Sequence, residues 1–512
     1  MRRLAAIVLA ALALPAAASA GTVFLLDGRG WGHGVGMSQW GAEGYARHGW
    51  DYRRILAHYY QHTSIALAHP RPVRVLLHDQ QTSVRIGSTA PFLVEDARGK
   101  KLHYPARSLV VDARFVLRHE RLRPPLRFVA GVQPLQVDFD PYRGDVIVER
   151  SPNGGLMVVN ELPLDRYLRG VVPWEAPKGW HFATYEAQAV AARSYTLATL
   201  KPKRLFDLYP DERSQMYGGV RAERPETNLA IGATAGQVLV YEGRIIPAYY
   251  FSTSGGRTSS IHDAWPKAVQ VPYLVSVPDP YDYISPRHVW PTTILTAARL
   301  GAVLGLGDVS DAVVVENSSG RAAAVRVLAG ARWHTVPANV FRVRFGLHST
   351  DFELRAMALD PLQPALFGAR VAVHGWVRGL GRARLQELTS RGWTTVAHLH
   401  PSSDGKFVAA IRAARSTQLR LAYNALAGDA VPLEVAPRVE LDAAGTNLRV
   451  RVSPRLPLLV QRLTRNAWRP VARANGVFAR ILRPGSYRVA VLGGAGYLSK
   501  LTRPVGLRRS GG

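Results

Sequence analysis

The chain has 512 residues, contains no cysteine, and carries a formal net charge of +28. The absence of cysteine excludes disulfide bonds, thiolate zinc sites and cysteine nucleophiles. The length indicates roughly three domains. The charge favours anionic partners, unless the arginines only reflect a compositional bias spread over solvated faces.

The first twenty residues have the pattern of a secretory signal peptide. Two arginines precede an apolar stretch at 4–14, and Ala18-Ser-Ala20 supplies the small residues of a cleavage site. Because the stretch is short for a membrane span, we prefer cleavage after Ala20 over an uncleaved anchor. We therefore expect export by the Sec route to the periplasm, cell wall or exterior, where anionic wall polymers are the natural partners.

A strand predicted at 23–26 leads into a glycine-rich run, Gly28-Arg-Gly-Trp-Gly-His-Gly-Val-Gly-Met-Ser-Gln-Trp-Gly-Ala42. Alternating glycines permit backbone angles closed to other residues and let a polymer approach the main chain. The side chains of this run that suit sugar faces, hydroxyls and acetamides are Trp31, His33, Ser38, Gln39 and Trp40. No window fits Gly-x-Gly-x-x-Gly, which excludes a dinucleotide site. The alternative is a purely structural turn before helices expected at 38–48 and 52–61.

Residues 71–159 alternate apolar and polar positions between glycine, proline and aspartate turns, which predicts a β-rich part. The clearest predicted strands lie at 73–77, 109–112, 126–129 and 145–148.

A second motif, Leu162-Pro-Leu-Asp-Arg-Tyr-Leu-Arg-Gly-Val-Val-Pro-Trp-Glu-Ala-Pro177, precedes a helix expected at 183–200. Its glutamate, Glu175, is surrounded in sequence by valine, proline, tryptophan and alanine, in a loop that two prolines stiffen. Apolar surroundings disfavour a charged carboxyl and raise its pKa, so Glu175 is suited to donate a proton near neutral pH. The alternative is a surface glutamate in a proline-rich turn.

These two motifs, with Tyr185-Glu-Ala-Gln-Ala-Val-Ala-Ala-Arg-Ser-Tyr195 on the helix, resemble the SpoIID/LytB family, which acts on bacterial peptidoglycan. The resemblance implies that Glu175 is the acid/base of a lytic transglycosylase, and it adds Gln188 and Arg193 as site residues. It extends over roughly residues 22–353. The family carries the glycine-histidine motif after a strand like Phe345-Gly-Leu-His-Ser-Thr-Asp-Phe352, so its place here indicates a circular permutation. We therefore expect the segment after Val23 to pair near 348–352.

Two further polar patterns are assigned no catalytic or metal-binding role. Ser252 and Ser254 lack the strand–Gly-x-Ser-x-Gly–helix context of a nucleophile, so we expect them in one wall of a glycan groove. His58 and His62 have a chelating spacing, but Tyr59 occupies the place of the metalloprotease glutamate. Neither a metal nor any other cofactor is predicted.

Residues 366–507 contain an internal repeat. Leu385-Gln-Glu-Leu-Thr-Ser-Arg-Gly-Trp393 aligns with Val460-Gln-Arg-Leu-Thr-Arg-Asn-Ala-Trp468, and Leu419-Arg-Leu-Ala-Tyr423 aligns with Tyr487-Arg-Val-Ala-Val491. Each unit has the size and alternation of a small β-sandwich. We predict two immunoglobulin-like modules, at 366–437 and 438–507, that bind wall polymer or act as spacers.

The sequence thus predicts an α+β, β-rich fold, with a SpoIID-like domain at 21–360 before the two modules. Within it, 71–159 forms the β-rich part and 160–353 the part with the catalytic motif. The predicted function is a lytic transglycosylase that cleaves glycan strands of N-acetylmuramic acid and N-acetylglucosamine and leaves 1,6-anhydro ends. The rival is a non-catalytic wall-binding enhancer, with an N-acetylmuramoyl-L-alanine amidase as partner. Nucleic acid is rejected as a partner, because the chain has an export signal and no recognition motif.

Overall fold

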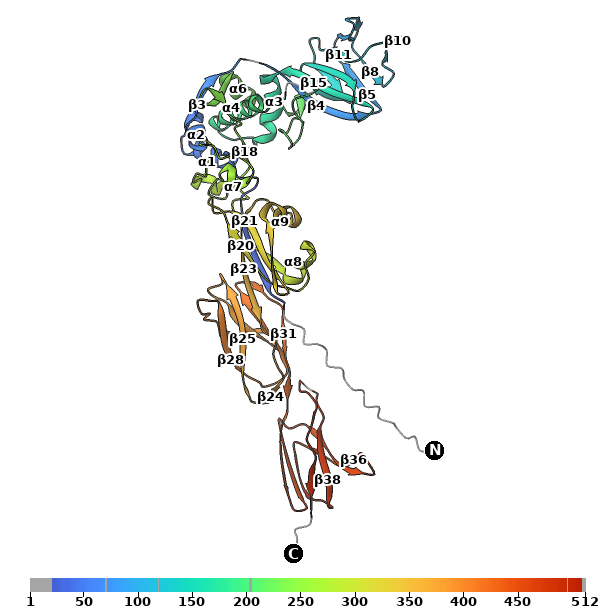
Figure 1. Ribbon diagram of the computed structural model, residues 1–512, viewed down its shortest axis with the longest axis vertical. Coiled ribbons are helices and arrows are strands. Elements are labelled where there is room, and N and C mark those ends of the chain that lie inside the picture. Colours follow the sequence, from blue (N-terminus) through green and yellow to red (C-terminus); the bar gives the residue numbers. More distant parts are fainter. Residues whose placement is uncertain (1–20, 70, 118, 202–204, 495, 509–512) are drawn as a thin grey trace.

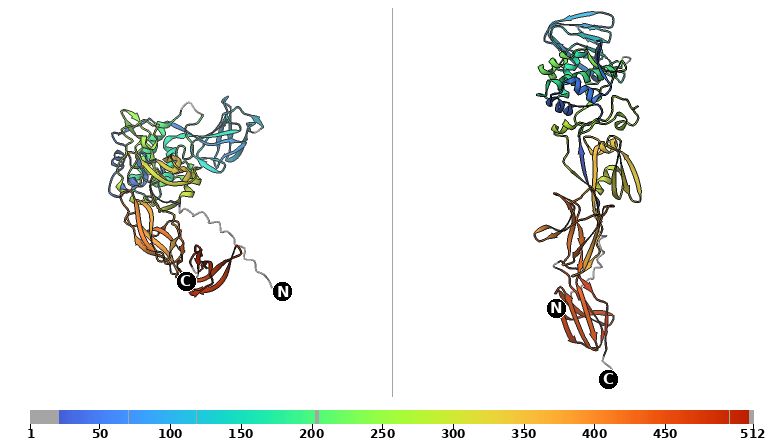
Figure 2. Two further views of the ribbon diagram at one scale, coloured as in Figure 1. Left: turned by 60° about the horizontal axis from the view of Figure 1, so that its bottom comes forward. Right: turned by 90° about the vertical axis from the view of Figure 1, so that its left-hand side faces the viewer.

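The computed structural model describes residues 21–69, 71–117, 119–201, 205–494 and 496–508, so the predicted signal peptide lies outside the described residues. The described parts follow one another along an elongated molecule, with the β-rich part at one end and residues 438–507 at the other (Figures 1 and 2). Strands predominate over helices, as an α+β, β-rich fold requires. Over the described residues, no helix is both long and apolar enough to span a bilayer.

The β-rich end is built from two sheets that enclose one apolar core. One sheet has the strand order β4-β15-β14-β11-β6-β7 and the other has the order β13-β12-β5-β8. Alternate residues of both sheets point into the core, which contains Phe92, Phe128 and Leu135. The strands are β4 (Pro72–Gln81), β5 (Ser83–Ser88), β6 (Phe92–Glu95), β7 (Lys101–Tyr104), β8 (Arg107–Asp112), β11 (Leu126–Val129), β12 (Leu135–Val137), β13 (Asp140–Tyr142), β14 (Asp145–Arg150) and β15 (Leu156–Pro163).

Strand β15 leads directly into a helical part. Its longer helices are α1 (Gln39–Arg47), α2 (Tyr52–Tyr59), α3 (Leu164–Glu175), α4 (Phe182–Thr199) and α6 (Pro225–Ala233). Helix α4 carries alanine and other small side chains on buried faces, so that α1, α2, α3 and α6 all pack against it. Caps fix the first two helices: Ser38 accepts a hydrogen bond from the N–H of Gly41, and Asp51 accepts one from that of Arg54.

The central sheet has the order β19-β1-β23-β25-β28 and carries the N-terminal strand in its interior. Strand β1 (Val23–Arg29) pairs with β23 (Asp351–Leu359), with Gly28 opposite Phe352 and Arg29 opposite Asp351. The predicted pairing of the first strand with the segment near 348–352 is therefore confirmed. The other strands are β19 (Thr293–Thr296), β25 (Arg370–Arg378) and β28 (Lys406–Arg412).

A smaller sheet and two helices cover one face of the central sheet. The sheet contains β20 (Val309–Glu316), β21 (Ala322–Ala329) and β22 (Arg332–Pro337), and the helices are α8 (Ala297–Leu304) and α9 (Ala338–Phe345). Their apolar side chains pack on Phe24, Leu26 and Leu354 of β1 and β23.

The opposite face of the central sheet packs on strands from the first repeat unit. These are β26 (Arg384–Thr389), β27 (Gly392–His398), β29 (Thr417–Tyr423) and β31 (Val431–Leu433). Val23 and Leu25 of β1 belong to the same core as Leu385 and Leu419. The predicted domain boundary at 360–366 therefore falls inside a continuous sheet, because β23 pairs with β25 across it.

Residues 438–507 form a separate sheet with its own core, which includes Val450, Val460, Phe478 and Tyr487. Its main strands are β33 (Arg438–Ala444), β34 (Asn447–Ser453), β35 (Pro457–Thr464), β36 (Ala467–Asn475), β37 (Val477–Ile481) and β38 (Gly485–Val491). Strand β36 pairs with β35, and β35 pairs with β38, which repeats the order β27-β26-β29 of the preceding unit.

Candidate functional site

Glu175 is the last residue of α3, whereas the sequence suggested a loop. Pro173 lies inside the helix, and Ala176 ends it by donating its N–H to the Val172 carbonyl. The N–H of Gly218 donates to the carbonyl of Gly170 at 3.0 Å, which ties the helix to the segment around Gln215 and Met216. The carboxyl is therefore held at a helix end rather than on a pliable turn.

The glycine-rich run comes back to this helix end from the far side of the sequence. Strand β2 (Met37–Ser38) lies parallel to β18 (Tyr250–Phe251), and this pair places the first residue of α1 beside α3. Gly36 adopts a φ of +77°, where a Cβ atom would collide with the Tyr249 carbonyl, so only glycine fits. The Gln39 side chain then donates from Nε2 to Glu175 Oε2 at 3.1 Å.

Both motifs line one pocket of about 810 Å³, a volume within the range of small-molecule clefts, about 300–1,000 Å³. Among its lining residues are Trp31, His33, Gln39, Trp174, Glu175, Tyr195, Glu212, Gln215, Tyr249, Tyr250, Ser252, Trp265, Arg342 and His348. Trp31 and Trp174 are 47% and 59% exposed, so part of each indole is accessible to a ligand. The pocket thus combines two carboxyl groups, Glu175 and Glu212, with a wall rich in aromatic side chains.

Burial raises the pKa of Glu175 above its ordinary value. Hydrogen bonds from Gln39, from the Met216 backbone and from the Tyr250 hydroxyl oppose this rise, and the charge of nearby Glu212 adds to it. Tyr250 is itself fixed, because its hydroxyl accepts a hydrogen bond from Gln215 Nε2 at 2.8 Å. The environment favours a carboxyl that keeps its proton at higher pH than a free side chain, as a general acid needs.

His33 lies in an aromatic enclosure of Tyr249, Phe251 and Trp265, with ring centroids 6.2, 5.5 and 5.0 Å away. Burial lowers the pKa of His33 to about 4, so the ring is neutral at physiological pH. Its Nδ1 accepts a hydrogen bond from the N–H of Val35 at 3.1 Å, which leaves the proton on Nε2. A hydrogen bond between the ring and the Tyr250 backbone holds His33 in place, so it forms a neutral, fixed part of the pocket wall.

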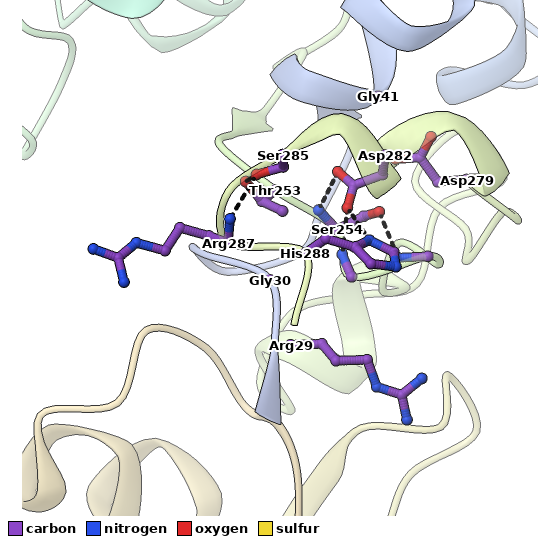
Figure 3. Close-up of polar contacts among 12 residues, drawn as sticks. Arg29, Gly30, Gly41, Thr253, Ser254, Asp279, Asp282, Ser285, Arg287 and His288 are labelled. Carbon is purple, nitrogen blue, oxygen red and sulfur yellow. Dashed lines mark hydrogen bonds and ion pairs between the residues drawn. The ribbon is translucent and has the colours of Figure 1, made fainter. Parts of the chain in front are cut away.

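A buried pair of aspartates anchors the loops behind the pocket (Figure 3). Asp282 accepts hydrogen bonds at 2.9 Å from the Ser38 hydroxyl and from the N–H groups of Ser254 and Gly255, and it contacts His288 Nδ1 at 3.0 Å. One carboxylate thus joins the glycine-rich run to the 252–256 loop. Nearby, Asp279 accepts a hydrogen bond from the Tyr59 hydroxyl at 2.8 Å.

A buried arginine holds the same loop from the other direction. Arg321 is 2% exposed and donates from Nη2 to the carbonyls of Ser254 and Arg257 at 2.6 and 3.0 Å. The loop that contains Ser252 is therefore fixed by both an acidic and a basic side chain.

The structure separates the predicted site residues into two groups. Trp31, His33, Gln39, Glu175 and Ser252 line the pocket. Ser38, Gln188, Arg193 and Ser254 do not line it and are all at most 1% exposed. Trp40, which the sequence analysis also placed among the side chains suited to sugars, instead packs on Trp180, with ring centroids 5.1 Å apart.

Arg193 connects helices and strands of the scaffold rather than facing the pocket. Its Nε donates to Asp165 of α3 at 3.0 Å, and its Nη atoms donate to the carbonyls of Gln237 and Ile231. These contacts connect α4 to its neighbours. Gln188, on the same helix, leaves its Nε2 without a hydrogen-bond partner among the described residues.

Several lining residues had no sequence signal that marked them. Nothing in the sequence positions of Gln215, Tyr249 and Tyr250 pointed to Glu175. Arg342 and His348 come from α9 and the turn after it, in segments that sequence analysis treated only as family-like or left unassigned.

The fold and the pocket define an elongated, β-rich protein whose helical part carries a carboxyl of raised pKa, Glu175, in an aromatic cleft. Residues 152–241, which include Glu175, match the family model for SpoIID, stage II sporulation protein. Stage II sporulation protein D of Bacillus subtilis is 31% identical over 215 residues, which cover 38% of this chain and 61% of that protein. The amidase enhancer of the same organism is 36% identical over 128 residues, or 25% of this chain and 17% of that protein.

The matched part of the chain, which carries Glu175, is therefore similar to the SpoIID/LytB family. It spans about three fifths of the length of the sporulation protein that it matches. Among solved structures, a tandem immunoglobulin fragment, DIP-gamma IG1+IG2, covers 30% of this chain and 98% of its own at 12% identity, with a TM-score of 0.14. That score is too low to define the fold of the β modules.

Proposed function

We propose that the protein is an exported peptidoglycan lytic transglycosylase with Glu175 as its single acid/base. The observation that carries the proposal is the position of Glu175: a carboxyl of raised pKa, bonded to Gln39 of the glycine-rich run, in a cleft lined by tryptophans and tyrosines. The similarity to a stage II sporulation protein D and to an amidase enhancer supports the broader part of the proposal, a function at the cell wall.

The proposed reaction uses the carboxyl twice. The Glu175 carboxyl gives its proton to the glycosidic oxygen as the bond from C1 of N-acetylmuramic acid breaks. The resulting carboxylate then accepts the proton of the C6 hydroxyl of the same sugar as that oxygen bonds to C1. The products are a 1,6-anhydro end and a free hydroxyl on N-acetylglucosamine, and no water is consumed.

The surrounding groups have supporting roles in this scheme. Gln39 orients the carboxyl, neutral His33 forms part of the wall against which a sugar packs, and Trp31 and Trp174 stack on sugar faces. Ser252 supplies a hydroxyl at the wall. Ser38, Ser254, Gln188 and Arg193 act through the scaffold, because their side chains are buried.

A second carboxylate, Glu212, lines the same pocket and is exposed. A hydrolytic glycosidase generally requires two carboxyl groups, whereas the proposed reaction requires one. Product analysis separates the two, because hydrolysis leaves a reducing end and lytic transglycosylation an anhydro end.

The second candidate function is a non-catalytic enhancer of an N-acetylmuramoyl-L-alanine amidase. The 36% identity to an amidase enhancer favours it. We also propose that residues 366–437 and 438–507 are immunoglobulin-like modules that contact anionic wall polymers, in keeping with the net charge of +28.

One assay tests the first proposal against the second. Purified protein is incubated with intact and with peptide-stripped peptidoglycan, and the soluble products are analysed by mass spectrometry. Anhydro-muropeptides or anhydro-disaccharides are the expected products. An enhancer would yield none from either substrate and would instead speed the release of stem peptides by an added amidase.

A further inference from the structure

The two repeat units share a surface feature that goes beyond their fold. In the first unit, the Arg420 guanidinium lies over the Trp393 ring at 4.1 Å and donates from Nε to Gln386 Oε1 at 2.9 Å. In the second unit, Arg488 lies over the Trp468 ring at 4.5 Å and donates from Nε to Gln461 Oε1 at 2.7 Å.

The match extends to the strand register. Gln386 lies opposite Arg420 across β26 and β29, as Gln461 lies opposite Arg488 across β35 and β38. Both hairpins have a register shift immediately before the glutamine, between Leu385 and Gln386 and between Val460 and Gln461. The same geometry is therefore built twice in one chain.

Each arginine has hydrogen-bonding capacity left over. In the part of the chain that the structure describes, the only hydrogen bond from either guanidinium is the one from Nε. Stacking and the glutamine hold each group flat, so both Nη atoms remain available as a planar, preoriented fork. Such a fork matches the two oxygens of a carboxylate.

An exposed leucine completes each unit. Leu388 lies directly opposite Trp393, and Leu463 directly opposite Trp468. These leucines are 37% and 40% exposed. Residues directly opposite in an antiparallel pair share a face, so each unit presents an apolar side chain beside its cation.

A role in stabilising the sheet explains the stacking of arginine on tryptophan but not the rest of each unit's surface. An arginine stacked on tryptophan stabilises a hairpin by roughly 0.5–1 kcal/mol at exposed sites. That role needs neither a free guanidinium fork nor an exposed leucine at the same place in both copies. A carboxylate-bearing sugar uses both features, because its ring face packs on leucine and tryptophan while its carboxylate meets the fork.

We propose that Gln386, Leu388, Trp393 and Arg420, and their counterparts Gln461, Leu463, Trp468 and Arg488, are two binding sites for carboxylate-bearing sugar units of a glycan strand. The inference rests on the proposed function for the source of the carboxylates, which is the same polymer that enters the Glu175 pocket. Two weak sites on one chain bind a repeating polymer together with a higher affinity than either alone.

The test uses the full chain with Glu175→Gln, so that the polymer is not cut during the measurement. Arg420→Lys with Arg488→Lys keeps the net charge and an aliphatic stem on each tryptophan, but removes the fork. Binding to peptide-stripped glycan strands should weaken by roughly tenfold or more. The control is Arg412→Lys with Arg480→Lys, two exposed strand arginines outside both sites, and it should bind like its parent.

A second variant keeps the inference testable if the lysine variant does not fold. Leu388→Ser with Leu463→Ser leaves both stacks in place and should weaken binding several-fold through lost sugar contact. Thermal unfolding of all variants is measured alongside. Glycan with its carboxylates converted to amides should bind the parent about as weakly as intact glycan binds the lysine variant.

Any of three outcomes would overturn the inference. The lysine variant binds glycan as tightly as its parent, amidation of the glycan does not weaken binding by the parent, or the lysine variant loses affinity only for polyglycerol phosphate and not for glycan. The proposed function fails separately. If the wild-type chain makes no anhydro products while the lysine variant still loses glycan binding, the transglycosylase assignment is wrong and the two sites stand.

Discussion

The chemistry of the pocket depends on the protonation state of Glu175, which a few neighbouring groups set. Gln39 donates to one carboxyl oxygen, and burial raises the pKa of the carboxyl. The charge of Glu212 raises that pKa further. Because a general acid must start protonated, cleavage should decline as the pH rises through the pKa of Glu175.

Glu212→Gln should move this alkaline decline to lower pH. The substitution removes a negative charge that favours the protonated form of Glu175, so its pKa falls. The measurement is the pH profile of kcat/KM on soluble glycan, with Glu242→Gln, an exposed residue outside the pocket, as the control. An unchanged profile would mean that the charge of Glu212 does not affect the pKa of Glu175. Complete loss of activity would favour a two-carboxylate mechanism.

Asp279 gives a prediction about stability rather than activity. Burial and the charge of Asp282 raise the pKa of Asp279 from 3.8 to about 7. The folded state therefore binds a proton that the unfolded state releases between about pH 4 and pH 7, and stability declines over that window as the pH rises. Asp279→Asn mimics the protonated acid and can still accept the Tyr59 hydrogen bond.

The free energy of unfolding of Asp279→Asn should thus depend less on pH between 4 and 7 than that of the wild type. The gap should open toward pH 7 in favour of the variant, by an amount on the order of a few kcal/mol. Denaturant unfolding at several pH values measures it. Parallel curves for the two proteins would show that Asp279 is ionised in the fold throughout.

At the scale of elements, the sequence patterns predicted the site's frame well. The first strand, α1, α2 and α4, and strands such as β11 all appear close to their expected positions, because apolar periodicity and turn residues mark them. The pairing of β1 with β23 was inferred from the displaced motif. Both motifs line one pocket, as expected from their joint presence in a family.

The details of the site were harder to predict because they depend on tertiary packing. A motif identifies Arg193 and Ser38 as important. It does not show that Arg193 donates its hydrogen bonds to Asp165 and backbone carbonyls, or that Ser38 donates to Asp282. Tyr250 of β18 reaches Glu175 and is held by Gln215, and the parallel pairing of β2 with β18 places Gln39 near the same carboxyl. No local pattern records such a contact between distant segments.

Helix α1 offers a direct test of the anchor behind the pocket. A Cβ atom on Gly41 would collide with the Tyr59 hydroxyl and the Asp279 carboxyl. Gly41→Ala should therefore destabilise the fold by about 1–3 kcal/mol through overpacking. Displacement of α1 should also weaken the contact between Gln39 and Glu175 and lower activity.

Gly232 of α6 is the matched control, because a Cβ there meets nothing within 4 Å. Gly232→Ala should be neutral or more stable by about 0.5–1 kcal/mol, since alanine is the better helix former. Chemical denaturation compares the two variants. If Gly41→Ala were as stable as the wild type, the close packing of α1 on Asp279 would be wrong.

For the whole molecule, the central sheet decides which parts of the chain must fold together. Strand β1 and strand β23 pack through one face on α8, α9 and their sheet, and through the other on residues from the first repeat unit. The first repeat unit therefore completes a core that begins at Val23. The second unit has a core of its own.

Truncation should distinguish the two units. A chain that ends at residue 437 should remain folded and keep any cleavage activity on short soluble glycan. A chain that ends at residue 365 should aggregate or unfold at lower temperature, because Val23, Leu25, Met357 and Leu359 lose their covering strands. Soluble yield and thermal unfolding measure this, and a stable, active chain ending at 365 would contradict the shared core.

Replacement of Glu175 by glutamine tests the central claim most directly. The change keeps the size of the side chain and a hydrogen bond with Gln39, but it removes the proton that the reaction needs. Release of anhydro sugars from peptidoglycan should fall by about 10²–10⁴-fold, while the unfolding temperature and glycan binding stay near those of the wild type. Glu186→Gln, a nearby substitution outside the pocket, should retain activity. Wild-type rates of anhydro-sugar release by Glu175→Gln would contradict the assignment of Glu175 as the acid/base.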